Sequence, residues 1–236
     1  MTSPARRHYQ RVSAALAAET AGETPMQGDA YELMQAALFE DYRRLKSTQS
    51  MERKAEIKRE ILPKYTDYVT GVLEAGQGAQ DDVLMRVMLW RIDAGDIAGA
   101  VAIARYALAH DLNPPDQFER STAAIIAEEV ADQALKRLDE EGIDTLDLLK
   151  QLIDVEILTR QADMHDQVRA KLFKALGYTQ RAAGQLVEAQ SSLERALALN
   201  DKVGVKKDLE RIERQIQQDN TKRQNAGDQG SPQNGA

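Results

Sequence analysis

Four aspartates stand close together in the stretch GAQDDVLMRVMLWRIDAGDIAGA, as Asp81, Asp82, Asp93 and Asp96. Carboxylate oxygens are ligands that Mg²⁺ prefers, so one interpretation is the site of a metal-dependent nuclease. A second interpretation needs no metal. Asp81 and Asp82 would begin a helix, where acids favour the helix dipole, and Asp93 and Asp96 would flank a turn. We favour the second interpretation.

The other residues suited to chemistry are few and scattered. The chain contains no cysteine, which excludes disulfides and thiolate metal sites, and His8, His110 and His165 do not stand at metal-ligand spacing. No glycine-rich loop ends in Gly-Lys-Ser or Gly-Lys-Thr, which argues against nucleotide hydrolysis by this chain. We therefore expect no metal site and no cofactor, and the sequence assigns no catalytic residue.

The net charge of −7 argues at first against a nucleic-acid partner, but the charges are unevenly distributed. Residues 1–18 carry three arginines and no acid, and residues 43–64 carry eight Lys or Arg against three Glu. Residues 110–170, in contrast, carry fifteen acids against six bases. This asymmetry indicates a basic N-terminal part and an acidic middle with different roles.

The two basic stretches predict contacts with a phosphate backbone. The candidate DNA-binding residues are Arg6, Arg7, Arg11, Arg43, Arg44, Lys46, Arg53, Lys54, Lys58 and Arg59. Two alternatives stay open: both stretches could be solvated helix faces, and the 43–64 charges could pair with the acidic region of a neighbouring copy. No residue can be placed against a base edge, so sequence readout is not assigned.

Apolar residues at steps of three and four account for every long segment, which predicts an all-α fold. Ser3 before Pro4 suits the start of a helix that ends near residue 20, and Pro63 is expected to interrupt a later helix. Trp90 could stack on a base, but in its apolar run we expect it to lie in the core. Helices are also expected at about 116–139 and 144–159, the second with Leu146, Leu149, Ile153 and Ile157 on one face.

Two segments resemble each other at a constant offset of 89 residues. Gly95, Ala100, Ala107 and Leu108 in the first correspond to Gly184, Ala189, Ala196 and Leu197 in the second. The second segment has the spacing of a tetratricopeptide repeat, with small residues where helices approach closely. Because 89 is not a multiple of about 34, we expect two similar helical hairpins and not a regular array.

The C-terminal end contains an apolar seam and a polar tail. Val205, Leu209, Ile212 and Ile216 follow one another at steps of four, three and four, which predicts a helix that pairs with another copy. We divide the chain into a basic N-terminal helical region (1–64), a helical core (65–200), this oligomerisation helix (201–218) and a disordered tail (219–236).

No membrane segment is expected, because no window approaches the roughly 20 apolar residues of a membrane span. The apolar run VSAALAA near the start is too short and too weak for an export signal. We expect the protein in the cytoplasm.

Four sequence motifs, taken in their order along the chain, resemble those of a known protein family. TSPARRHYQRVSAALAAE comes first, followed by LPKYTDYVTGVLEAGQGAQDDVLMRVMLWRIDAGDIAGAVAIARYALAH, DMHDQVRAKLFKALG and GVKKDLERIER. Together they resemble the small terminase subunit of the peduovirus group of temperate tailed phages and their prophages, a family often labelled "terminase, endonuclease subunit". The resemblance covers residues 1–218 and is most specific in GAQDDVLMRVMLWR with GDIAGA and IARYAL.

This resemblance implies a role in viral genome packaging. Such subunits bind double-stranded phage DNA at the packaging site, here a cohesive-end site, and assemble as homo-oligomers such as rings. They deliver the DNA to a large terminase subunit that carries the ATPase, in the cytoplasm of the bacterial host. We expect this chain to be required for site-specific cutting without itself holding the cutting residues. The alternatives are a helical-repeat adaptor that binds only protein and an autonomous metal-dependent DNA endonuclease.

Overall fold

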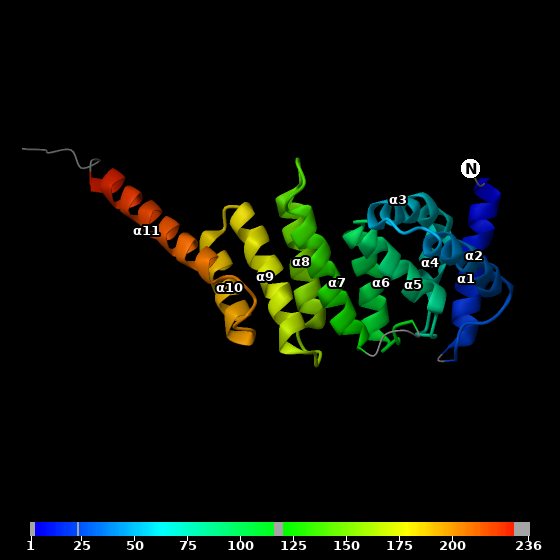
Figure 1. The fold of residues 1–236 in the computed structure, drawn as a ribbon. Coiled ribbons are helices and arrows are strands. Elements are labelled where there is room, and N and C mark those ends of the chain that lie inside the picture. Colours follow the sequence, from blue (N-terminus) through cyan, green and yellow to red (C-terminus); the bar gives the residue numbers. More distant parts are fainter. Residues whose placement is uncertain (1–2, 23, 116–119, 229–236) are drawn as a thin grey trace, which may run out of the picture.

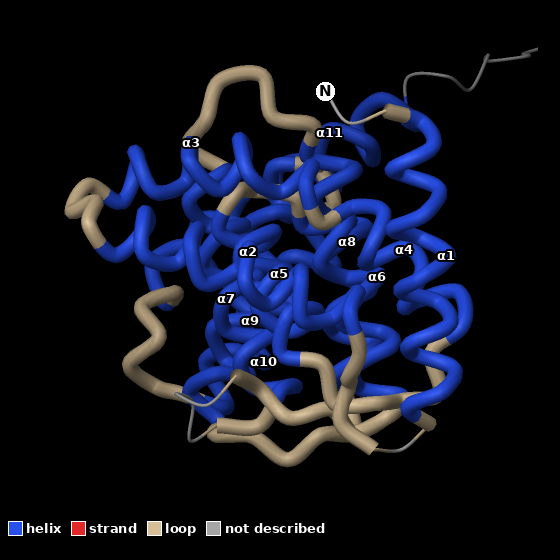
Figure 2. The backbone as a smooth tube through the Cα atoms, turned by 90° about the vertical axis from the view of Figure 1, so that its right-hand side faces the viewer, coloured by secondary structure: helices blue, strands red, loops and turns tan. Residues whose placement is uncertain are grey.

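The computed structural model describes residues 3–22, 24–115 and 120–228, with the backbone alone for the last six of these. Within these ranges the chain forms eleven α-helices, one short 3₁₀-helix and no strand, which confirms the predicted all-α class (Figures 1 and 2). The elements are α1 (Pro4–Ala21), α2 (Asp29–Lys46), α3 (Met51–Ile61), η1 (Leu62–Lys64), α4 (Thr66–Ala75), α5 (Asp82–Asp93), α6 (Ile97–Ala109), α7 (Thr122–Arg137), α8 (Thr145–Thr159), α9 (Asp166–Ala182), α10 (Leu186–Leu199) and α11 (Lys206–Asp228).

The helices follow one another along an elongated stack (Figure 1). Helix α1 lies at one end against α4, and α11 projects from the other end beyond α10. Helices α2 and α3 lie together across α5 and carry the second basic stretch, at the same end of the molecule as α1, which carries the first.

The predicted helix boundaries have clear chemical causes. The Ser3 hydroxyl accepts a hydrogen bond from the backbone N–H of Arg6 at 3.3 Å, which caps α1. Pro63 lies in η1 and separates α3 from α4, as expected of a residue that cannot continue a helix.

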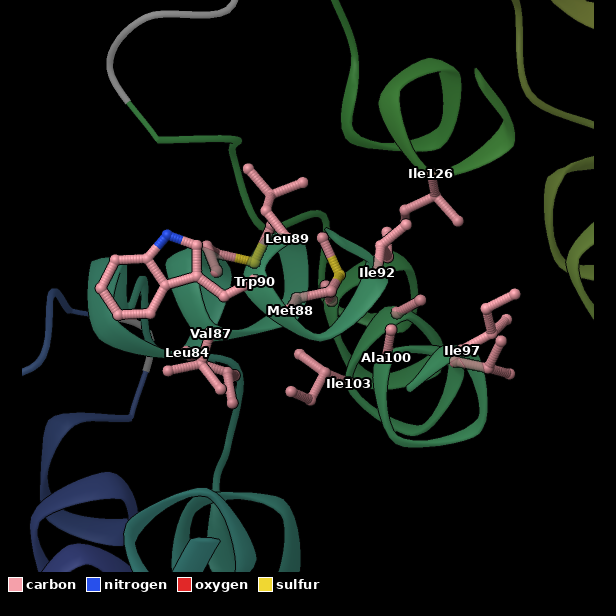
Figure 3. Packing of buried hydrophobic residues seen from close by; sticks show 14 of the residues in the cluster. Leu84, Val87, Met88, Leu89, Trp90, Ile92, Ile97, Ala100, Ile103 and Ile126 are labelled. Carbon is pink, nitrogen blue, oxygen red and sulfur yellow. The ribbon is translucent and has the colours of Figure 1, made fainter. Parts of the chain in front are cut away.

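Helix α5 is the centre of the core, with most of its side chains buried. Eight of its twelve residues are buried, and its charged residues Asp82, Arg86, Arg91 and Asp93 are partly exposed. Figure 3 shows Ile126 of α7 on one side of α5 and the ring of Trp90 on the other. Trp90 is 4% exposed and meets Tyr65 edge-to-face at 6.0 Å between ring centroids, which confirms its core position. One apolar cluster runs from Ala14 to Leu176 and is continuous across the predicted boundary at residue 64.

The α5–α6 and α9–α10 hairpins share the same turn at the predicted offset. The backbone N–H groups of Ala94 and Gly95 donate to the carbonyls of Trp90 and Ile92, and those of Ala183 and Gly184 donate to Thr179 and Arg181. Gly95 and Gly184 have φ angles of +84° and +78°, a conformation that glycine adopts without strain. The two turns therefore have the same hydrogen bonds and the same backbone conformation at glycine.

The apolar face expected on α8 is only partly in the core. Leu149 is buried, whereas Leu146, Ile153 and Ile157 are exposed. The buried face contains Leu148, Leu152 and Val155 in their place. The sequence offers two overlapping apolar faces on this helix, and packing against α7 and α9 selects one of them.

The C-terminal seam packs within its own chain. Val205, Leu209 and Ile212 are buried in a second apolar cluster with Ala189 and Leu193 of α10, and Ile216 lies at its edge. Contact with another copy through these side chains would require α11 to leave α10. Helix α11 also continues to Asp228, so residues 219–228 of the predicted disordered tail are helical, and residues 229–236 lie outside the described ranges.

Candidate nucleic-acid interface

The first of the four aspartates has a structural role in the core. Asp81 caps α5 by accepting the backbone N–H of Leu84 at Oδ1, 2.9 Å away, and it accepts the Tyr68 hydroxyl at Oδ2, 2.7 Å away. Burial raises the pKa of Asp81 to about 6, and the hydrogen bonds from Leu84 and Tyr68 oppose that rise. The carboxylate therefore joins α4 to α5.

Asp93 and Asp96 are also engaged by other groups of the chain. Asp93 forms an ion pair with Lys58, and Asp96 caps α6 by accepting the Gly99 N–H at 2.9 Å while it pairs with Arg91. Within the described part of the chain, no group of three His, Asp or Glu side chains is placed to hold a metal ion. The structure thus makes Asp81 and Asp96 helix caps and places Asp93 and Asp96 in ion pairs.

Two arginines of α1 bind their own chain. Arg7 pairs with Asp67 at 3.1 Å and Arg11 pairs with Glu74 at 2.8 Å, both on α4. Gly71 permits this contact, because a Cβ at that position would lie 2.3 Å from the carbonyl oxygen of Arg11. These two ion pairs link α1 to α4 and neutralise part of the charge of both arginines.

Ion pairs also engage much of the basic charge of the α2–α3 hairpin. Arg44 pairs with Glu60 at 2.6 Å and Arg53 pairs with Glu56 at 2.6 Å, while Arg43 pairs with Glu40 at 3.3 Å within α2. Exposed pairs of this kind contribute little to stability, about 0–1 kcal/mol each.

Four of the predicted cations lack a carboxylate within 4.0 Å among the described residues. They are Arg6, Lys46, Lys54 and Arg59. Arg59 donates instead to the carbonyl of Ala94 at 3.0 Å, and Arg6 lines a hollow with Lys64. Lys46 and Lys54 line a pocket of about 280 Å³ between α2, α3 and α5.

Arg86 of α5 lies in the same pocket and was not among the predicted residues. Its guanidinium lies over the ring of Tyr42, 5.6 Å from the centroid, and it too has no carboxylate partner among the described residues. A lone arginine inside the otherwise apolar run VLMRVMLW is the sequence signal for it. Its proximity to Lys46 and Lys54 depends on how α5 packs under the hairpin.

Comparison with known proteins gives the family. The model of the family "Phage small terminase subunit" matches residues 35–167, more than half of the chain. The chain belongs to the phage small terminase subunit family.

Two curated relatives of this small terminase subunit agree with that match. The chain is 47% identical over 217 residues to the "Terminase, endonuclease subunit" of Escherichia phage P2, which covers 92% of this chain and 86% of the relative. It is 25% identical over 198 residues to the "Probable terminase, endonuclease subunit" of Haemophilus phage HP1, covering 78% of this chain and 69% of that protein. No solved structure matches the chain.

Membership in the family gives the small terminase subunit a role in phage DNA packaging. The residues matched by the family model include most of α2 and all of α3 and α5, and so the whole pocket that contains Lys46, Lys54 and Arg86. None of the described helices has the length and apolar character that a membrane crossing requires.

Proposed function

We propose that this protein is the recognition subunit of a phage terminase. As a homo-oligomer in the host cytoplasm, it binds double-stranded phage DNA at the cohesive-end packaging site and directs the cutting there. It then delivers the DNA to the large terminase subunit, whose ATPase drives packaging.

The observation that carries this proposal is a group of cations without carboxylate partners at the α1–α3 end of an acidic chain. Arg6, Lys46, Lys54, Arg59 and Arg86 have no such partner among the described residues. Cations that are not neutralised within the protein can displace counterions from a phosphate backbone. Arg7, Arg11, Arg43, Arg44, Arg53 and Lys58 are partly or fully engaged by their own acids, and we give them a smaller share of the DNA contact.

Self-assembly would support DNA binding by a chain of negative net charge. Each copy contributes a few phosphate contacts, and linking the copies raises the effective concentration of the next contact. The seam on α11 is occupied by α10, so contacts between copies are better supplied by exposed apolar residues elsewhere. Such residues are Tyr9, Val12 and Leu16 on α1 and Leu146, Ile153 and Ile157 on α8.

The roles of Asp81, Asp93 and Asp96 favour direction of cutting over cutting by this chain alone. Asp81, Asp93 and Asp96 are each held by a capping hydrogen bond or an ion pair. A magnesium ion would therefore compete with these partners for the carboxylate oxygens.

A helical-repeat adaptor that binds only protein is the second candidate. The two hairpins with the same turn favour it, because such hairpins build protein-binding surfaces in repeat proteins. This candidate predicts no salt-dependent DNA binding.

One experiment separates these functions. Purified protein is incubated with DNA that carries the cohesive-end site, with and without the large subunit and magnesium, and both the mobility shift and the cleavage are scored. We expect a shift with the protein alone and cleavage only when the large subunit and magnesium are added. Cleavage by the protein alone would indicate an autonomous nuclease, and no shift under any condition would indicate the adaptor.

A further inference from the structure

The pocket between α2, α3 and α5 combines positive charge with an apolar wall. Lys46, Lys54 and Arg86 reach it from three different helices, and Leu45, Leu89 and Trp90 form its apolar lining. These three side chains belong to the core and are 6%, 8% and 4% exposed, respectively, where they line the pocket. A ligand in the pocket would meet cationic groups and this apolar surface together.

The charge in the pocket is uncompensated. Among the described residues, the acid in its lining is Asp93, which is paired with Lys58, whose side chain is 11% exposed. The other three cations have no carboxylate within 4.0 Å in the described part of the chain, which leaves a local charge of three positive groups. Phosphate is an anion that both lysine and arginine bind well.

The lining offers an aromatic edge beside these cations. The Arg86 guanidinium lies over Tyr42, at 5.6 Å from the ring centroid, and Trp90 lines the neighbouring wall. Bases of single-stranded nucleic acids bind to such surfaces, with cations along the backbone. A base inside a duplex is stacked between its neighbours and cannot reach a pocket wall.

The size of the pocket limits the ligand to one small unit. Its volume of about 280 Å³ lies just below the roughly 300–1,000 Å³ found for small-molecule sites. A single nucleotide is of that order, whereas a duplex can touch only the rim.

We propose that this pocket binds one unstacked nucleotide of a DNA strand, with its phosphate at Lys46, Lys54 and Arg86 and its base against Leu45, Leu89 and Trp90. The inference deepens the proposed function, since it rests on DNA being the partner. It names single-stranded DNA as the form recognised at this point, in addition to the duplex contacts made by the outer cations.

Trp90 makes the pocket directly observable, because it is the only tryptophan in the chain. We would titrate the full-length protein with a short oligothymidylate, with thymidine 5′-monophosphate and with inorganic phosphate, and follow the Trp90 emission. Binding of the oligothymidylate is measured separately by anisotropy of an attached dye. We expect the oligothymidylate to change the emission, the mononucleotide to do so more weakly, and inorganic phosphate to leave it unchanged.

Two variants and a control test the assignment of residues. Arg86→Gln and Lys54→Gln should each weaken oligothymidylate binding at least about tenfold, the loss expected for one charge-assisted hydrogen bond. Lys150→Gln, which removes an exposed charge on α8 outside the pocket, should bind like the parent. Circular dichroism checks that each variant is folded, and Lys54 lies on an outer helix where the substitution leaves the core intact.

The outcomes separate this inference from the proposed function. Oligothymidylate that binds without any change in Trp90 emission, or inorganic phosphate that changes the emission as strongly, overturns the nucleotide pocket. A shift of packaging-site duplex together with no binding of oligothymidylate also overturns it, while the proposed function stands. Emission changes with oligothymidylate and no binding of packaging-site duplex would support the pocket and contradict the proposed function.

Discussion

The hydroxyl of Tyr68 donates a 2.7 Å hydrogen bond to the buried carboxylate of Asp81, and the same carboxylate caps α5. This contact assigns the aspartate pair at the start of α5 to structure. It also gives the fold a dependence on pH, because Asp81 is fully buried and its pKa is raised by that burial.

Replacement of Asp81 by Asn should remove part of this pH dependence. The pKa of Asp81 is about 6 in the folded protein against an ordinary value of 3.8, so the folded state holds the proton more tightly. The protonated Asp81 side chain therefore contributes to the free energy of unfolding in full below about pH 4. This contribution, on the order of 3 kcal/mol, is lost as the pH rises through about 6. Asn keeps an oxygen for the Leu84 N–H and cannot ionise.

Urea denaturation of the parent and of Asp81→Asn, at several pH values between about 4 and 7, measures this difference. The stability of the parent relative to the variant should fall as the pH rises. A difference that stays constant across the range would show that the buried carboxyl does not titrate there.

The double substitution Asp81→Asn with Asp82→Asn should leave the reconstituted terminase able to cut packaging-site DNA. We expect this because Asp81 is a helix cap and Asp82 is a first-turn acid of α5. Cleavage by the variant together with large subunit and magnesium is the measurement. If cleavage is lost while DNA binding and assembly are intact, the two aspartates are ligands of a catalytic metal ion and our interpretation is wrong.

Adding a Cβ at Gly95 or at Gly184 should lower the free energy of unfolding by the same amount. Both have positive φ angles, and neither has an atom within 4 Å of the added Cβ, so the cost is conformational alone. We expect Gly95→Ala and Gly184→Ala each to reduce the free energy of unfolding by about 1–2 kcal/mol. Asn tolerates this conformation better, so Gly95→Asn should recover part of the loss. A cost at one hairpin only would contradict the equivalence of the turns.

Charges introduced into the C-terminal seam should detach α11 from its own chain. Leu209→Asp with Ile212→Asp places two carboxylates in an apolar cluster that has no partner for them. Hydrogen exchange of residues 206–228 should lose its protection even where light scattering finds the same assembly as in the parent. Retained protection with a smaller assembly would mean that another copy covers the seam.

Much of the fold follows from local chemistry in the sequence. Ser3, Asp81 and Asp96 cap helices as their residue types predict, and Pro63 and the two turn glycines mark real interruptions. Trp90 lies in the core as expected. The caps and interruptions depend on neighbours within a few residues, so capping and turn rules are enough to find them, and the apolar run around Trp90 indicates its burial.

Other features depend on contacts between distant segments. Arg7 and Asp67 are 60 positions apart, and Lys58 and Asp93 are 35 apart, so charge counts cannot show that these cations are already paired. The seam of α11 has the spacing of an oligomerisation helix, and only the position of α10 shows what covers it. Arg86 joins the basic pocket for the same reason.

Binding of packaging-site duplex as a function of salt tests the central claim that unpaired cations at the α1–α3 end hold DNA. We would measure anisotropy of the labelled duplex with the parent, with Arg6→Gln combined with Arg59→Gln, and with a control of equal charge, Lys136→Gln combined with Lys150→Gln. The affinity of the parent should fall steeply with salt, and the log–log slope of the first variant should be shallower by roughly 0.9 for each phosphate that the variant no longer neutralises. The control should keep the parent's slope. Equal slopes and affinities in all three proteins, or no salt-dependent binding by the parent, would contradict the account.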